Sequence, residues 1–504
     1  MCPVEGWPVD MTGSTSSSTS GSTSGSTSGS ASSSQHLRRS LSLTGATMTS
    51  TGLAFAVIDY IAVVSILAYT VGVSAWLAVL IAGFLVLIVS GLFSELNGLY
   101  PTAAGIRLYM TSAMGERKAM ITTFTYLTSV VLVIAADAFL IGSAIQHVLG
   151  GPSIAAYGWI VLLLALAVGG NLFGVRMAGA VQTIVTSIVL VSTFAISVVA
   201  IATTHGSYNY PLGLFHKGIF HGVQALIFAV FLYAAFEWVT TAAEEVRKPA
   251  VITRALFIAP VILFIVAGVF SVALAHAVPH TAMHNSAYPQ LLLGKAALGE
   301  AGMIWMLGAT MVAAMNTFNG GFLVASRFIY AAAREGILPR VFARLNMKAV
   351  PWVAVLVLGV SSGVIAAAVF ATRQWLLLVA VGSVLEAGIY AVAGYCVVRL
   401  RRKEADRTRP FTLKFGRLLG IFAMVVFGIL TVIGAFSDPR HPSHLSLLPF
   451  LVVAVLGLLS TVYVVVFMPK VRAKAAARVA ASKPRRRPPR ANITNITDID
   501  TTEQ

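Results

Sequence analysis

The chain has 504 residues, of which 57% are hydrophobic and 11% are charged, and its mean hydropathy is +0.85. Soluble domains are about 25% charged, so this composition excludes an ordinary soluble protein and indicates a polytopic membrane protein. The net charge is +17. Its two cysteines, Cys2 and Cys396, lie too far apart to indicate a disulfide framework or a metal site.

Both ends of the chain have the composition of disordered terminal segments. Residues 11–34 are nearly all Ser, Thr and Gly, so they have no apolar surface to bury. They also lack the apolar stretch of a signal peptide. The sequence therefore predicts a disordered cytoplasmic tail over residues 1–40 and a basic disordered tail over 471–504. The basic run at 483–490 fits an anionic lipid surface.

Twelve apolar runs lie between these tails, within residues 41–470. About 20 apolar residues cross the hydrocarbon layer as a helix. Continuous apolar character over that length favours helices over barrel strands, which alternate. The sequence therefore predicts an all-α membrane protein with twelve transmembrane helices. Their approximate spans are 43–69, 74–99, 119–147, 155–170, 177–203, 220–243, 254–278, 300–330, 351–371, 375–398, 413–436 and 445–468.

The positions of Lys and Arg predict the orientation of these helices. Of the 35 basic residues, 31 lie on the side of the two tails and four on the other. Basic residues concentrate on the cytoplasmic side of membrane proteins, so both termini are predicted to be cytoplasmic in a plasma (inner) membrane. The same distribution explains the net charge by topology and attraction to anionic membrane lipid, without nucleic acid. The four other residues are Lys217, Lys295, Arg373 and Arg440.

One apolar run carries a charge near its middle. Val223 to Ala243 contains one ionisable residue, Glu237. A carboxylate at this depth costs about 2.5–3.5 kcal/mol on insertion scales, so Glu237 is expected to face protein or water. It is either a structural acid bonded to a neighbouring helix or part of a substrate or proton path. We find no Walker A loop, no C-x-x-C pair and no H-E-x-x-H motif, so no cofactor and no enzyme activity are predicted.

Two stretches of the chain contain spaced sequence motifs. The first, at 94–109, reads Ser-Glu-Leu, then Pro-Thr-Ala-Ala-Gly, then Tyr109, and is similar to E-L…P-x-x-G-G-x-Y-x-Y. Ala104 replaces the first Gly of that pattern and Arg107 its first Tyr. The second, at 236–249, begins Phe-Glu and is similar to G-F-E…E-E-V-K-N-P, with Ala235 where Gly is usual.

Two further stretches extend this resemblance along the chain. Residues 318–339 begin Phe-Asn-Gly-Gly-Phe and end Ala-Arg-Glu-Gly-Ile-Leu-Pro, which is similar to the helix 8 signature. Residues 171–176, Asn-Leu-Phe-Gly-Val-Arg, add a weaker match. In their order and spacing, the four stretches resemble the amino acid–polyamine–organocation (APC) superfamily of secondary transporters.

This resemblance implies a specific architecture. Two inverted five-helix repeats are expected over about 41–203 and 219–400, with two extra helices at about 413–468. Substrate is expected at the bilayer midplane between helices 1, 3, 6, 8 and 10, where helices 1 and 6 are unwound. Free backbone N–H groups there can hold a carboxylate, and carbonyls or acids can hold an ammonium group. Rocking around this fixed site gives alternating access.

The break in helix 1 departs from the superfamily pattern. Counting places it at Ala56–Ile58 or at Ile58–Tyr60, and neither stretch has the usual G-S-G glycines. Asp59 instead lies in or beside the break. The resemblance implies substrate contacts at Ala56, Val57, Ile58, Asp59, Asp137, Phe231, Tyr233, Ala234 and Asn319, and coupling roles for Glu237 and Asp59.

Several acids are thereby predicted on site-forming helices. Asp59, Asp137 and Glu237 are three, and Glu386 is a fourth candidate. Carboxylates in a dry site repel one another, so protons or a cation must neutralise some of them, unless they serve helix interfaces. This pattern favours a proton-coupled carrier of amino acids or related amines, with a lean towards a cationic substrate. A neutral amino acid symporter or exchanger, and more remotely a nutrient sensor, are the alternatives.

The sequence of helix 5 does not identify the coupling ion. Some members of the superfamily carry a lysine there at a position that a sodium ion occupies in others. Counting without gaps places Val189 at that position in this chain. This removes one argument against sodium, although the acids favour protons.

Overall fold

A computed structural model describes most of the chain that the sequence analysis assigned to helices. The described residues are 41–55, 71, 74–102, 105–173, 179–204, 218–243, 246, 248, 250–286, 288–439 and 444–482. Within these ranges the regular structure is helical, apart from isolated β-bridges, so the predicted all-α class is confirmed.

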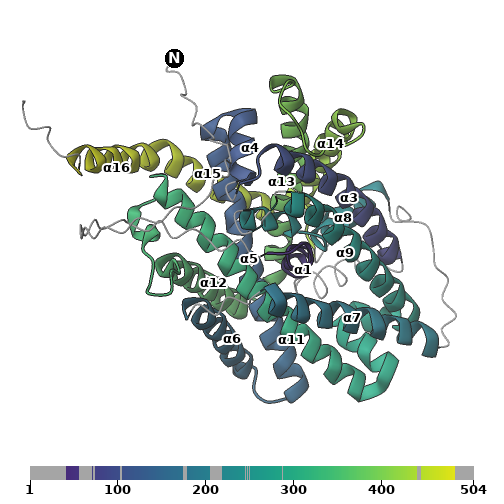
Figure 1. The fold of residues 1–504 in the computed structure, drawn as a ribbon. Coiled ribbons are helices and arrows are strands. Elements are labelled where there is room, and N and C mark those ends of the chain that lie inside the picture. The colour runs from purple at the N-terminus through teal and green to yellow at the C-terminus, as the bar shows by residue number, and fades with distance from the viewer. Residues whose placement is uncertain are drawn as a thin grey trace, which may run out of the picture. The chain divides into compact units, whose positions relative to one another are not determined.

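Figure 1 shows the described part of the chain as a set of packed helices. Eleven of the described helices are long and apolar enough to cross a membrane. The first apolar run is only partly described, so the predicted count of twelve stays a prediction. The elements up to α10 are α1 Leu43–Ala54, α3 Ala75–Leu99, α4 Gly105–Met114, α5 Glu116–Leu149, α6 Ile154–Leu172, α7 Gly179–Thr203, α8 Ile219–Phe231, η3 Phe236–Ala242, α9 Ala250–Ala277 and α10 His280–Asn285. The remaining elements are α11 Pro289–Arg334, η4 Arg340–Ala343, α12 Trp352–Thr372, α13 Trp375–Lys403, α14 Gly416–Ala435, α15 Leu448–Val462, η5 Tyr463–Phe467 and α16 Met468–Ser482.

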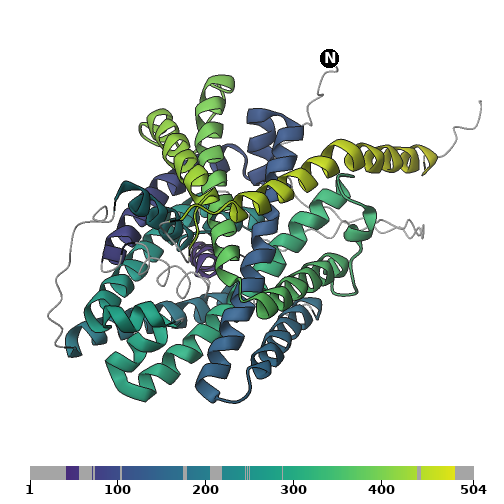
Figure 2. The ribbon, with the colours of Figure 1, turned by 180° about the vertical axis from the view of Figure 1, so that it is seen from behind.

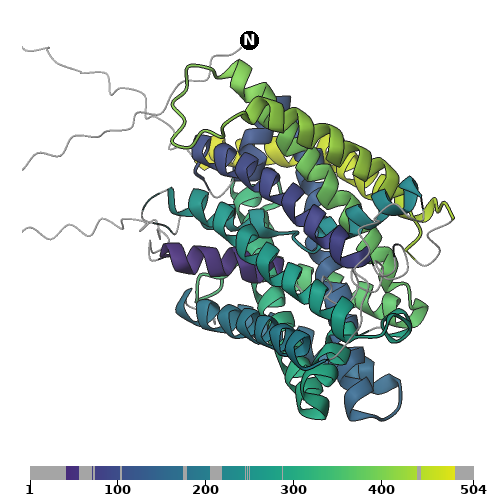
Figure 3. The same cartoon turned by 90° about the vertical axis from the view of Figure 1, so that its right-hand side faces the viewer.

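Helix α1 lies inside the bundle, in contact with α7, α9, α11 and η3 (Figure 3). Small residues allow close helix contacts, because lipid gives helices no hydrophobic reason to associate. The pair α13–α14 shows this at Gly394, where an added Cβ would lie 2.5 Å from the carbonyl oxygen of Gly420. The two backbones therefore meet directly, and larger side chains at these positions would separate the helices.

Helix α11 contains a sharp turn near its start. Leu298 and Gly299 have non-helical backbone angles, and Gly299 has a φ of 64° that favours glycine. The segments on either side fold against each other, since a Cβ on Gly302 would lie 2.0 Å from the carbonyl oxygen of Gly294. The long membrane helix thus begins near residue 300, where the apolar run predicted it.

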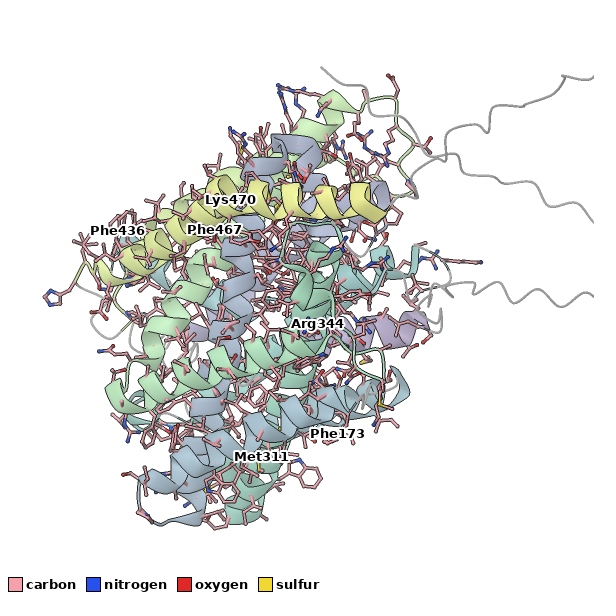
Figure 4. The ribbon with its side chains drawn as sticks, turned by 90° about the vertical axis from the view of Figure 1, so that its left-hand side faces the viewer. Phe173, Met311, Arg344, Phe436, Phe467 and Lys470 are labelled. Carbon is pink, nitrogen blue, oxygen red and sulfur yellow. The ribbon has the colours of Figure 1, made fainter. Side chains whose placement is uncertain are left out.

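The last membrane helix is longer than predicted. It runs from α15 through the π-helical turn η5 into α16, and Figure 2 shows α16 continuing from it. Residues 471–482, assigned above to a disordered tail, are helical because this stretch is rich in alanine. The Arg472 guanidinium is paired with the Glu116 carboxylate at the start of α5. At the start of α16, Lys470 lies over the ring of Phe467, 6.0 Å from its centroid (Figure 4).

An ion-pair network joins the ends of α3 and α13. Glu95 accepts hydrogen bonds from Arg401 Nε at 2.8 Å and from Arg401 Nη2 at 2.6 Å. It also accepts one from the backbone N–H of Leu413 at 3.0 Å. The Glu95 side chain is 3% exposed, so this charge is almost fully withdrawn from water. Its three donors therefore hold α3, α13 and the loop before α14 together.

Candidate functional site

The candidate site forms around a break in the sixth predicted membrane helix. Helix α8 ends at Phe231, the next residues form turns, and the tighter helix η3 begins at Phe236. This confirms the expected break in helix 6. Helix α1 also ends early, at Ala54. The predicted helix 1 contacts Ala56, Val57, Ile58 and Asp59 lie outside the described residues.

Ala235 is the strained residue of this break. Its φ of 71° lies in the left-handed region, which costs an L-residue roughly 1–2 kcal/mol. In this conformation its backbone N–H donates a hydrogen bond to Glu386 Oε1 on α13, at 3.3 Å. The superfamily's usual glycine would adopt the same angles without that cost. The break thus presents a backbone donor to a buried acid.

Replacing Ala235 with glycine is expected to raise the free energy of unfolding, by up to about 1 kcal/mol, because it removes the left-handed strain. The hydrogen bond to Glu386 comes from the backbone and is retained. Denaturant unfolding of purified protein in detergent measures the effect. Ala234→Gly is the matched control, because Ala234 has no positive φ and its substitution should only destabilise. A loss of stability in both variants would contradict the assignment of strain to Ala235.

A buried cluster of side chains lies beside the break. The Tyr126 hydroxyl of α5 makes hydrogen bonds with Glu237 Oε1 on η3 and, at 2.8 Å, with Glu386 Oε2 on α13. The Trp238 Nε1–H donates to the Tyr126 oxygen at 3.1 Å, and the two rings stack with centroids 5.2 Å apart. All four side chains are buried. The cluster therefore joins three elements that the resemblance assigned to the substrate site.

The hydrogen bonds of this cluster constrain the protonation state of its two carboxyl groups. A phenol hydroxyl has one hydrogen, and an ionised carboxylate has none to donate. Tyr126 can therefore donate to Glu237 or to Glu386, but not to both. The second carboxyl must carry a proton and donate it to the Tyr126 oxygen, which also accepts from Trp238. At least one of the two carboxyl groups is accordingly protonated in this arrangement.

Sequence reasoning found the acids of this cluster but missed its aromatic members. Glu237 and Glu386 stand out because charges are rare in apolar runs. Tyr126 and Trp238 lie in the same kind of run, where an aromatic residue gives no comparable signal. Only the break before η3 and the position of α5 bring them together.

Asp137 lies away from this cluster. It is buried in α5, eleven residues after Tyr126. At 1.5 Å per residue, the two positions are about 16 Å apart along the helix. The structure therefore does not join Asp137 to the Glu237–Glu386 pair, and its predicted contact with substrate stays a prediction.

The other predicted contact residues have identifiable surroundings. Phe231 packs against α13, where a Cβ on Gly382 would lie 2.8 Å from its ring. The Tyr233 hydroxyl donates to the carbonyl of Val79 at 3.0 Å. Asn319 Oδ1 accepts a hydrogen bond from the Asn171 side chain at 3.0 Å. Ala234 is buried within the break. None of these contacts identifies a ligand.

A second polar group surrounds the end of α1. Asn316 Nδ2 of α11 lies 3.2 Å from Thr186 Oγ1 of α7 and 3.4 Å from the carbonyl oxygen of Gly52. A Cβ on Gly52 would lie 2.4 Å from that Asn316 nitrogen. Glycine is thus needed here for the contact between α1, α7 and α11. Val189, counted above as the helix 5 position, lines a small pocket next to Phe55.

Comparisons with known proteins agree with this architecture. The family model described as "Amino acid permease" matches residues 37–468. The chain is 29% identical over 245 residues to "Cationic amino acid transporter 4, vacuolar" of Arabidopsis thaliana, a match that covers 46% of this chain and 39% of that protein. It therefore spans less than half the length of that relative.

Two bacterial relatives match over more of their length. The chain is 25% identical over 434 residues to the gamma-aminobutyric acid permease of Bacillus subtilis, covering 81% of this chain and 89% of that protein. It is 23% identical over 368 residues to the D-serine/D-alanine/glycine transporter of Escherichia coli O6:H1, covering 67% and 76%. The named relatives are transporters rather than enzymes. With the family model matching most of its length, this chain belongs to the amino acid permease family.

Proposed function

We propose that this protein is a secondary active transporter that moves amino acids or related amines by alternating access and takes up a proton with its substrate. The observation that carries the proposal is the Tyr126 hydroxyl shared by Glu237 and Glu386. These residues lie on α5, η3 and α13, three elements that surround the break in helix 6. A proton bound in this cluster stabilises the contact between these elements.

Loss of that proton provides the coupling. Two carboxylates and one hydroxyl cannot satisfy each other, and two like charges in a dry site repel strongly. The deprotonated cluster therefore favours separation of η3 from α13. Because the Ala235 N–H also bonds to Glu386, separation changes the backbone of the break itself. Proton binding and the geometry of the substrate site are thus linked.

Proton flux in proteoliposomes tests this proposal. An internal pH indicator is recorded while arginine, putrescine, alanine or gamma-aminobutyrate is added outside, with no sodium present. We expect acidification only with transported substrates and only in liposomes that contain the protein. Uptake that requires sodium and moves no protons would show that sodium, and not the proton, is the coupling ion. Binding of substrate without any flux would instead support a nutrient sensor.

We also infer a preference for cationic or amine substrates. The argument rests on the excess of acids on site-forming helices, including Asp59, and on the lack of glycine at the predicted helix 1 break, 56–60, to hold a carboxylate. Two of the relatives are named for cationic amino acids and for gamma-aminobutyrate, whereas another is named for small neutral amino acids. Competition with labelled arginine distinguishes these classes. Stronger inhibition by alanine than by putrescine or lysine would favour a neutral amino acid carrier.

We propose that the protein resides in the plasma (inner) membrane with both termini in the cytoplasm. The uneven distribution of Lys and Arg supports this orientation. On a background without Cys2 and Cys396, a cysteine at Ser207 should react with an impermeant reagent from outside. A cysteine at Ala405 should react only after the membrane is opened. The reverse pattern would invert the topology.

A further inference from the structure

Three buried polar atoms of η3 and α4 stand out. They are the second carboxyl oxygen of Glu237, the hydroxyl of Thr240 and the hydroxyl of Tyr109. None of the three has a hydrogen-bond partner within the part of the chain that the structure describes. An unsatisfied buried polar atom costs about 1–3 kcal/mol, and such atoms are usually satisfied by internal water.

The backbone places these three atoms on facing surfaces. Glu237 and Thr240 are three residues apart in η3, and side chains with this spacing are aligned in a 3₁₀-helix. A Cβ on Gly105 of α4 would lie 3.5 Å from Thr240 Cβ. Tyr109 follows Gly105 by four residues, so it lies on the same face of α4. The Tyr109 hydroxyl is therefore directed towards η3.

Two further observations place Tyr109 close to Glu237. Phe93 contacts both the Tyr109 ring, at 6.3 Å between centroids, and the Phe236 ring, at 5.9 Å. The pKa of the Tyr109 phenol is raised well above its ordinary value, first by burial and then by the neighbouring Cys396 and Glu237. These are the titratable groups that face it from α13 and η3.

We propose that Tyr109, Thr240 and Glu237 Oε2 form a site for internal water that carries the coupled proton from Glu237 to the end of α4. The inference rests on the proposed proton coupling. The Glu237 carboxyl gives its proton to the bound water, and the water gives a proton to solvent, so Glu237 is left as a carboxylate. The two hydroxyls orient the water and keep their own protons. Solvent is close, because Arg107 of α4 pairs with Glu335, which is 44% exposed.

The Tyr109→Phe variant of the full-length protein tests this route, because it removes only the hydroxyl. In proteoliposomes, we expect proton-driven uptake of labelled arginine to fall about tenfold, in line with the loss of one hydrogen bond in the path. Substrate counterflow, which needs no net proton release, should stay within about twofold of wild type. Thr240→Val should behave like Tyr109→Phe, and Thr240→Ser should restore uptake because it keeps the hydroxyl.

Tyr463→Phe is the matched control, because it removes a hydroxyl that donates to the Ile337 carbonyl elsewhere in the protein. It should leave both assays unchanged. Wild-type proton-driven uptake in Tyr109→Phe, or equal losses in uptake and counterflow, would overturn the proposed route. If Glu237→Gln abolishes proton coupling while Tyr109→Phe keeps it, only the route is wrong. If Glu237→Gln also keeps it, the coupling proposal itself fails.

Discussion

Replacing Glu237 with glutamine is expected to lower proton-driven uptake at least tenfold and to remove most of its dependence on external pH. Glutamine has nearly the same shape and keeps a carbonyl oxygen for the Tyr126 hydroxyl, but it cannot bind or release a proton. Wild-type uptake should rise as external pH falls, because the inward proton gradient increases. The variant should show a flat profile, measured as initial uptake rates from acidic to mildly alkaline external pH.

Counterflow and two control variants make this result specific. Counterflow should persist in Glu237→Gln, since the helices can still exchange substrate without net proton movement. Glu386→Gln should also flatten the profile, because glutamine at the other end of the shared hydroxyl cannot bind or release a proton either. Glu300→Gln should not, because Glu300 is an exposed partner of Lys295. A normal pH profile with normal rates in Glu237→Gln would make Glu237 a structural acid.

Replacing Glu95 with alanine is expected to reduce the free energy of unfolding by about 3 kcal/mol or more. Removal of one partner of a buried ion pair typically costs about 3–5 kcal/mol. The lower end applies here, because Arg401 is 22% exposed and keeps its bond to the Leu413 carbonyl. Arg401 would lose both of its bonds to Glu95, and the Leu413 N–H would lose its acceptor. Denaturant unfolding in detergent, with helix content followed by circular dichroism, measures the change.

Glu300→Ala provides the matched comparison. The Lys295–Glu300 pair has the same shortest N···O distance, 2.6 Å, as Arg401–Glu95, but both of its side chains are more than half exposed. Exposed pairs contribute about 0–1 kcal/mol, so this variant should unfold almost like wild type. Equal losses in the two variants would show that burial does not determine the strength of the Glu95 contacts.

The candidate site was only partly predictable from the sequence. Glu237 and Glu386 interrupt apolar runs, and the motif around Phe236 located the break in helix 6. Tyr126 gives no such signal in the sequence, because a tyrosine in an apolar helix is compatible with simple packing. Its role depends on contacts between residues more than 100 positions apart, which local pattern does not encode.

The fold was more predictable, and its errors have clear physical causes. Long apolar runs specify membrane helices through the thickness of the bilayer alone. The predicted start of the disordered tail at residue 471 was wrong. The basic residues suggested a tail, whereas the alanines of α16 favour a helix. The turn at Gly299 depends on one glycine and on tight contact between Gly294 and Gly302, which hydropathy does not detect.

Under the proposed proton coupling, the single hydroxyl shared by Glu237 and Glu386 also limits the substrate gradient that the protein can build. If the cluster alternates between states that differ by one proton, the proposed coupling moves one proton per cycle. A proton entering down one pH unit and 100 mV releases about 3.7 kcal/mol, enough to accumulate a neutral substrate several hundredfold. A monovalent cationic substrate adds about 2.3 kcal/mol of electrical work, which raises the limit to about twenty thousandfold. The charge of the substrate therefore contributes more to its accumulation than a further pH unit would.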